Sequence, residues 1–243
     1  MPTNRCVLLS MLTMMFACGA DEPSASLKNG LTSRDWRPLG PTEPYAGKSL
    51  SEWSEAWFRW SLAQTSCDSP ATDLDGSKCA LYQDGEAPVF FLAFAPSLAE
   101  RSKCVLPTGK ALLVPVAPVS IQVIPGEEPR SEQELRDEAS SVVASMRDLT
   151  LKVDGEVIDV SEDYVVGPMT MAVEIPPAPN LFSCRGIKNV AEVVLDPVVG
   201  AGYFALLPPP PEGEHRLIHT GVASVDGFNE EFGAATRLRV AAR

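Results

Sequence analysis

The chain has 243 residues, of which 45% are hydrophobic and 21% charged, and its formal net charge is −12. A surface this acidic repels the phosphates of nucleic acids and anionic lipids, so we expect no nucleic-acid partner. The length fits one large all-β domain better than two small domains.

The first residues have the pattern of a signal peptide. Arg5 precedes an apolar run over residues 7–17, which is too short for a membrane span of about 20 residues. The run ends at Cys18 and resembles the lipobox of bacterial lipoproteins, whose cysteine is acylated. We therefore predict a lipoprotein signal peptide over residues 1–17 and lipidation of Cys18. The alternative is cleavage after Ala20, which would release an unlipidated secreted protein.

Acyl chains on Cys18 would make the membrane a partner of the protein. Each buried methylene contributes about 0.8 kcal/mol, and two or more chains give stable attachment. Gly19 follows Cys18, which resembles the sorting pattern of outer-membrane lipoproteins and predicts a periplasmic or cell-surface location.

Residues 18–46 are predicted to form a flexible tether. They are rich in Pro, Ser, Asp and Glu and carry too few apolar residues to form a core. Trp36 and Tyr45 are exceptions that could contact the domain predicted over residues 47–243.

The clearest helix signal lies in residues 48–64. Ser49 and Glu52 form a capping box, and the helical spacing places Leu50, Trp53, Trp57 and Trp60 on one face. Such a face packs on a sheet in most proteins, but three indoles can also form a binding platform for a sugar ring or a protein partner. Trp53, Trp57 and Trp60 are therefore candidate binding residues.

Four cysteines lie beyond Cys6 and Cys18, and an even number in an exported chain predicts two disulfides. Four cysteines allow three pairings. We favour Cys79 with Cys104, which bracket one predicted strand, and consequently Cys67 with Cys184. The spacings do not match a CxxC zinc site, so no metal is predicted from them.

Residues 65–87 are predicted to form a loop. Within it, Asp73, Asp75 and Gly76 resemble the start of a calcium-binding loop. However, Tyr82 occupies the closing position, where such a loop requires an acidic residue. We predict no metal or other cofactor here.

The remainder of the chain is predicted to be mainly β. Short apolar runs bounded by Pro and Gly predict strands at residues 88–95, 110–117, 120–124, 163–167, 169–175, 191–195, 202–207, 214–220 and 236–241. A turn is expected over residues 103–110, and Asp154-Gly155 predicts a hairpin within residues 149–160. A second helix, capped by Ser131, is predicted over residues 131–149.

This pattern predicts a mainly β fold: a two-sheet β-sandwich, jelly-roll or Ig-like, with two accessory helices.

His215 and His219 are the two histidines of the chain and lie in a predicted strand. Four residues along a strand place both rings on one face but about 13 Å apart, too far to share a metal ion. One of them could act as a base beside Asp226 or Glu214, although hairpin or edge-strand histidines without chemistry are the more common case. Both are candidate binding residues, and no catalytic residue is assigned.

The order of several segments resembles a widespread family of uncharacterised secreted bacterial proteins. The segments of this chain that match the family's features are the Trp-rich helix, Cys79, the strand PVFFLAFA, the segment from Arg101 to Leu112 and the C-terminal strand from Gly213 to His219. The resemblance covers residues 47–241 and implies a secreted β-rich domain. Cys79 and Cys104 belong to the shared features, which supports pairing them, but the resemblance implies no activity.

No GxSxG or other nucleophile motif is present in the sequence. We therefore expect a cell-envelope lipoprotein with a non-catalytic binding or structural role toward a protein or glycan. The alternative is a secreted hydrolase or lyase acting on envelope or extracellular polysaccharide through paired carboxylates.

Overall fold

The computed structural model describes residues 36–95, 98–160, 162–225 and 228–241. These residues form nine β-strands in two sheets, three α-helices and a short 3-10 helix, Glu162–Tyr164. The predicted fold class, a mainly β two-sheet sandwich with accessory helices, is confirmed. No helix in these residues has the length and apolar character needed to cross a membrane. The predicted signal peptide and Cys18 lie outside the described residues.

The first sheet has four strands in the order β1-β3-β7-β6. Their bounds are β1 Val89–Phe91, β3 Ala111–Gln122, β7 Val193–Leu207 and β6 Val165–Ile175. β1 is parallel to β3, whereas β3 and β6 are both antiparallel to β7.

The second sheet has five strands in the order β2-β9-β8-β4-β5. Their bounds are β2 Ala99–Pro107, β9 Phe228–Ala241, β8 Gly213–Val225, β4 Arg147–Val153 and β5 Glu156–Ile158. β2 is parallel to β9, and the other pairs are antiparallel.

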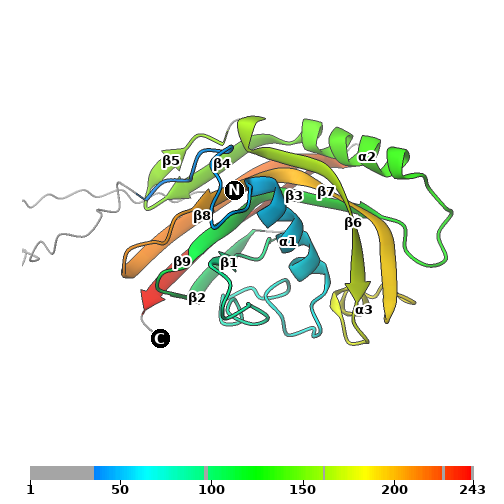
Figure 1. Ribbon diagram of the computed structural model, residues 1–243, viewed down its shortest axis with the longest axis horizontal. Helices are drawn as coiled ribbons and strands as arrows, with labels where there is room; N and C mark the ends of the chain where they lie inside the picture. Colours follow the sequence, from blue (N-terminus) through cyan, green and yellow to red (C-terminus); the bar gives the residue numbers. More distant parts are fainter. Residues whose placement is uncertain (1–35, 96–97, 161, 226–227, 242–243) are drawn as a thin grey trace, which may run out of the picture. The chain divides into compact units, whose positions relative to one another are not determined.

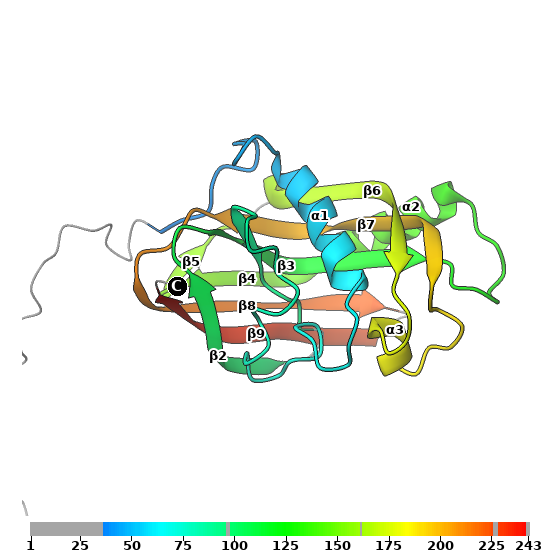
Figure 2. The same ribbon diagram turned by 60° about the horizontal axis from the view of Figure 1, so that its bottom comes forward.

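The four-stranded sheet packs on both of its faces. One face covers the five-stranded sheet, with Leu112 and Val114 of β3 packed among Leu217 of β8 and Leu238 of β9. The opposite face is covered by α1, Leu50–Leu62, which lies across the strands (Figure 2). The second helix, α2, Glu132–Ser145, packs on the side of β7 away from α1 (Figure 1).

The first helix forms as predicted. Ser49 caps it, and the reciprocal hydrogen bonds of Ser49 and Glu52 make the expected capping box. Leu50, Trp53 and Trp57 are buried against the sheet.

The buried face of this helix is wider than the sequence predicts. Ser54, which lies outside the predicted face, is fully buried and donates its hydroxyl proton to the Leu50 carbonyl. Phe58 is buried as well, because Gly200 on β7 leaves room for its ring: a Cβ at Gly200 would lie 2.7 Å from it.

The second helix ends earlier than predicted. α2 stops at Ser145, and residues 147–149, expected to be helical, begin β4 instead. Met146 is extended, and Arg147 pairs with Val222 of β8. The amphipathic pattern continues past the helix end, whereas pairing with a distant strand leaves no signal in the local sequence.

Three pairs of predicted strands are single strands in the structure. Residues 110–117 and 120–124 join as β3, residues 163–167 and 169–175 as β6, and residues 191–195 and 202–207 as β7. In β3 the prolines are tolerated because β1 pairs only with residues 111–113, so Pro115 and Pro118 have a strand neighbour on one side alone.

β2 and the third helix, α3, Leu181–Cys184, were not predicted. Residues 103–107, expected to belong to a turn, lie in β2, and the turn is confined to Thr108 and Gly109. The Asp154-Gly155 hairpin between β4 and β5 is confirmed, with both residues at positive φ.

Both favoured disulfides are confirmed. Cys79 pairs with Cys104, and Cys67 pairs with Cys184. The first joins the loop after α1 to β2, and the second joins that loop to α3. Two disulfides are compatible with an exported protein.

The segment before α1 packs against the sandwich from Trp36 onward. The Trp36 indole is 2% exposed and donates its N–H to the Pro208 carbonyl at 2.7 Å. Leu39 donates its backbone N–H to Leu206 of β7, and Tyr45 packs against the cluster under α1. The expectation that Trp36 and Tyr45 contact the domain is confirmed.

Candidate functional site

The three tryptophans of α1 attach the helix to its surroundings. Each indole N–H donates to a backbone carbonyl: Trp53 to Tyr45 at 3.0 Å, Trp57 to Leu92 at 2.8 Å and Trp60 to Tyr82 at 2.9 Å. Trp53 and Trp57 are buried, whereas Trp60 is partly exposed. These contacts hold the indoles in fixed orientations rather than presenting all three as one open platform.

A pocket of about 250 Å³ lies where α1, β3 and α3 meet, and we call it the α1 pocket. It is lined by Trp57, Phe58, Ser61, Leu62, Ala71, Phe94, Pro118, Val119, Ser120, Leu181 and Arg185. Of the three candidate tryptophans, only Trp57 lines it.

The aromatic wall of the α1 pocket is rigid. The ring centroids of Trp57 and Phe58 lie 5.2 Å apart, and each ring also packs edge-to-face on Phe204 of β7. Trp57 and Phe58 are 3% and 2% exposed, so neither can move without disturbing the core. The wall is therefore present before any ligand binds.

Three polar side chains line the same pocket: Ser61 of α1, Ser120 of β3 and Arg185 after α3. Within the described ranges, neither hydroxyl forms a hydrogen bond, and the Arg185 guanidinium forms no hydrogen bond or ion pair. Arg185 is exposed, yet the protein around it desolvates the guanidinium enough to lower the pKa of Arg185 below its ordinary value. The pocket thus combines an apolar body with a cation, Arg185, that has no partner among the described residues.

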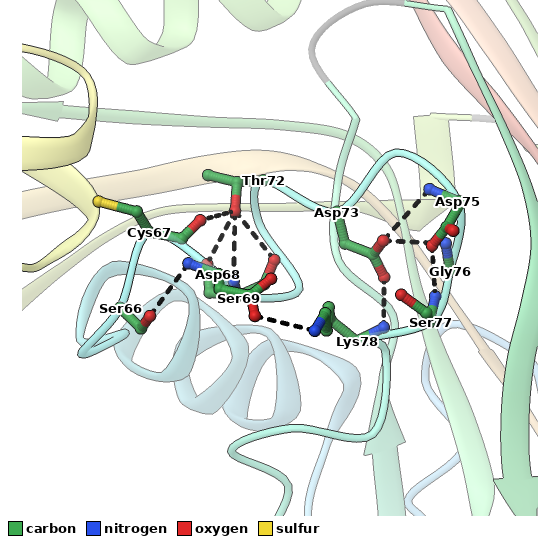
Figure 3. Close-up of polar contacts among 10 residues, drawn as sticks. All are labelled: Ser66, Cys67, Asp68, Ser69, Thr72, Asp73, Asp75, Gly76, Ser77 and Lys78. Carbon is green, nitrogen blue, oxygen red and sulfur yellow. Dashed lines mark hydrogen bonds and ion pairs between the residues drawn. The ribbon is translucent and has the colours of Figure 1, made fainter.

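The loop that borders the pocket is held by its own polar contacts (Figure 3). Thr72 donates its hydroxyl proton to the Cys67 carbonyl, and Lys78 forms an ion pair with Asp68 at 2.8 Å. Together with the Cys67–Cys184 disulfide, these contacts fix Ala71 and α3 on either side of the pocket.

The acidic residues that resemble a calcium loop have other partners. The Asp73 carboxylate accepts backbone N–H groups from Asp75, Gly76 and Lys78 (Figure 3). Asp75 forms an ion pair with Lys103 at 2.6 Å, and this contact is the main reason that the pKa of Asp75 is strongly lowered. In the part of the chain described, no three His, Cys, Asp or Glu residues are grouped to hold a metal ion.

Arg101 of β2 is buried behind this loop. Its side chain is 3% exposed and donates to the carbonyls of Asp73, Ala93 and Phe94. Burial lowers the pKa of Arg101, an effect partly opposed by the negative charge of Asp73. Arg101 therefore fixes the segment that ends in Phe94, a wall of the α1 pocket.

His215 forms a closed set of contacts at the other end of β8. Its Nδ1 lies 2.7 Å from the Asp154 carboxylate, and its Nε2 lies 2.9 Å from the Pro211 carbonyl. A carbonyl oxygen only accepts, so Nε2 must donate and has no lone pair for a substrate proton. The ring also packs edge-to-face on Trp36, and His215 is 6% exposed.

His219 is fully buried between the sheets. Neither ring nitrogen has a hydrogen-bond partner among the described residues, and Phe94 stacks nearby with a centroid distance of 6.2 Å. Burial, with a smaller contribution from the charge of Arg101, lowers the pKa of His219 to about 3. The ring is therefore neutral at physiological pH.

Both histidines lie on the same face of β8, as their spacing predicts, and both are buried. β8 is the central strand of its sheet, so the edge-strand part of the expectation is wrong. β8 does pair antiparallel with the next strand of the chain, β9, as a hairpin strand does. The structure does not bring either ring to the α1 pocket.

The fold and the pocket define a disulfide-bonded β-sandwich with a preformed, mainly apolar pocket under its first helix. No family model, curated protein or solved structure matches the chain. The resemblance to the secreted bacterial family stays a prediction.

Sequence reasoning did not identify Arg185, Ser120 or Phe94 as pocket residues. A local signal exists for Arg185: Asn180 caps α3 through a reciprocal hydrogen-bond pair with Ser183, which places Arg185 directly after a helix. The convergence of α1, β3 and α3 depends on sheet order and on the Cys67–Cys184 disulfide, neither of which is a local property.

Proposed function

We propose that this protein is an exported, non-catalytic binding module of the bacterial cell envelope. In this proposal it is anchored to the outer membrane through acylated Cys18 and binds a protein or glycan component of the envelope in the α1 pocket. The observation that carries the binding role is the pocket itself, about 250 Å³ in volume, with a rigid aromatic wall and polar groups that have no partner in the described part of the chain.

Three observations support export and anchoring. The described cysteines are all paired in disulfides, which persist in oxidising compartments. The N-terminal sequence resembles a lipoprotein signal peptide, and the low apolar content after Cys18 is typical of a tether.

The placement of the histidines supports a non-catalytic role. Both nitrogens of His215 are engaged, and His219 is fully buried with a pKa of about 3. A general base needs a free nitrogen within reach of a substrate and a pKa near the working pH. Neither ring meets these requirements in this structure.

Intact mass measurement of the mature protein, without reduction, tests the anchor. Protein recovered from bacterial membranes should begin at Cys18, carry acyl chains and lack two hydrogens for each disulfide. An unmodified chain beginning at Asp21 in the medium would contradict the anchor and favour a released protein.

Native mass spectrometry of the membrane-purified protein tests the binding role. We expect a bound envelope component that is lost in Ser61→Leu, because the larger side chain fills the α1 pocket. Ser51→Leu, an exposed position on the same helix, is the matched control and should retain it. Turnover of a glycan or ester that disappears when a single His or Asp is changed would overturn the proposal.

A further inference from the structure

The lining of the α1 pocket restricts what can enter it. Among the described residues that line it, eight of eleven are apolar, and the polar remainder consists of Ser61, Ser120 and Arg185. A sugar ring carries hydroxyls on most of its carbons and would leave several of them without partners against such walls, which is unfavourable. The lining therefore favours an apolar group with a single polar end.

The volume sets the size of that group. An apolar cavity of about 150 Å³ holds benzene. The α1 pocket, at about 250 Å³, has room for a side chain the size of phenylalanine or leucine together with a small polar group.

Arg185 sets the charge of the polar end. A guanidinium presents paired N–H groups that match a carboxylate, and no acceptor occupies those of Arg185 in the described structure. One cation on a chain of net charge −12 is better matched by a singly charged carboxylate than by a phosphate, which carries nearly two negative charges. The two serine hydroxyls offer further hydrogen bonds to the same group.

We infer that the α1 pocket binds the C-terminal residue of a partner polypeptide, with an apolar side chain against Trp57 and Phe58 and the terminal carboxylate on Arg185. This inference rests on the proposed binding role of the pocket and selects a protein over a glycan as the partner. A chain terminus is the part of a protein where an apolar side chain and a free carboxylate belong to the same residue.

Calorimetric titration of the full mature chain with two peptides tests the inference. Acetyl-Ala-Ala-Phe with a free carboxylate should bind at least about tenfold more tightly than the same peptide with a C-terminal amide, because a hydrogen-bonded ion pair is replaced by a neutral contact. Amide NMR shifts should locate binding at Ser61, Ser120 and Arg185.

Arg185→Gln should remove the preference for the carboxylate, because the glutamine amide offers both peptides a neutral hydrogen bond. Binding of the amide peptide by the variant shows that its pocket remains folded. Arg239→Gln, which removes an exposed arginine of β9, is the matched control and should behave as the wild type.

Three results would overturn the inference: equal binding of acid and amide, an Arg185→Gln variant that keeps the preference, or tighter binding of glucuronate than of the acid peptide. None of these three results affects the expected loss of the envelope component in Ser61→Leu, which is measured in a separate experiment. The proposed function can therefore hold when the inference about the ligand fails, and the two failures are distinguishable.

Discussion

His215 and His219 lie on the same face of β8, yet their environments are opposite. His215 has a partner at each nitrogen, whereas His219 has none in the described structure. Substitution of His215 and substitution of His219 should therefore affect the stability of the fold differently.

We expect His219→Leu to reduce the acid sensitivity of the fold. The pKa of His219 is lowered from 6.5 to about 3 in the folded state, so the unfolded chain binds the extra proton between these values. The folded wild type therefore loses stability as the pH falls from about 6.5 toward 3, by up to about 1.4 kcal/mol per pH unit.

Urea unfolding of wild type and His219→Leu at pH 4 and pH 6 measures this effect. Between pH 6 and pH 4, the unfolding free energy of the wild type should fall by roughly 2 kcal/mol more than that of His219→Leu. Titration of other groups is common to both proteins and cancels in the difference. Parallel pH profiles would show that His219 is not the titrating group.

Asp154 is expected to tolerate Asn but not Ala. Its carboxylate contacts His215 and accepts the backbone N–H of Arg216 at 2.8 Å, and its φ is 50°. Asp154→Ala removes both contacts and places a residue poorly suited to positive φ in the turn, so we expect a loss of about 2 to 3 kcal/mol.

Asp154→Asn keeps an acceptor for Arg216 and adopts positive φ readily. The His215 ring can keep its Nε2–H on the Pro211 carbonyl and accept the amide N–H at Nδ1, so the loss should stay below about 1 kcal/mol. Chemical denaturation of both variants distinguishes this account from one in which the negative charge itself is required.

At the scale of elements, the capping of α1 links the sequence to the pocket. Ser49 accepts the N–H of Glu52, and the Glu52 carboxylate accepts the N–H of Ser49 at 2.8 Å. These hydrogen bonds lower the pKa of Glu52 and fix where the helix begins. The start of the helix sets which residues face the sheet and which line the pocket.

Ser49→Ala should lower the unfolding free energy by about 1 kcal/mol, the usual cost of losing an N-cap. Ser51→Ala is the matched control: Ser51 is exposed inside the first turn, where alanine has the higher helix propensity. Thermal unfolding of the two variants should move in opposite directions. Equal midpoints would mean that tertiary packing alone fixes the helix start.

At the scale of the whole molecule, the two disulfides close loops of different lengths. Cys67 and Cys184 are 117 residues apart, and Cys79 and Cys104 are 25 residues apart. On the chain-entropy model these crosslinks contribute about 4.8 and about 3.5 kcal/mol. The longer one also joins two walls of the α1 pocket.

We therefore expect Cys67→Ala with Cys184→Ala to cost more stability than Cys79→Ala with Cys104→Ala. The first double variant should in addition lose the bound envelope component, because Ala71 and Arg185 are no longer held across the pocket. Urea unfolding and native mass spectrometry give the two readouts. A first variant that keeps its ligand would show that the pocket does not depend on the crosslink.

The sequence alone determined the local features: the N-caps Ser49 and Ser131 of the first two helices, the Asp154-Gly155 hairpin, the mainly β class and the favoured cysteine pairing. Each of these depends on residues close in the chain, or on the few possible pairings of four cysteines. Local signals failed where a distant strand decides the local structure. Residues 147–149 begin a strand because this strand pairs with β8. Pro118 lies inside a strand because the short β1 does not extend to it and leaves that edge of β3 open.

Only the tertiary structure decided where the candidate site lies. Trp57, Ser120 and Arg185 come from segments far apart in the sequence, and they meet because α1 crosses the four-stranded sheet and a disulfide holds α3 beside it. Likewise, the engagement of His215 and the burial of His219 depend on packing between two sheets. Such convergence has no local code, because contacts between distant segments are fixed by the fold as a whole.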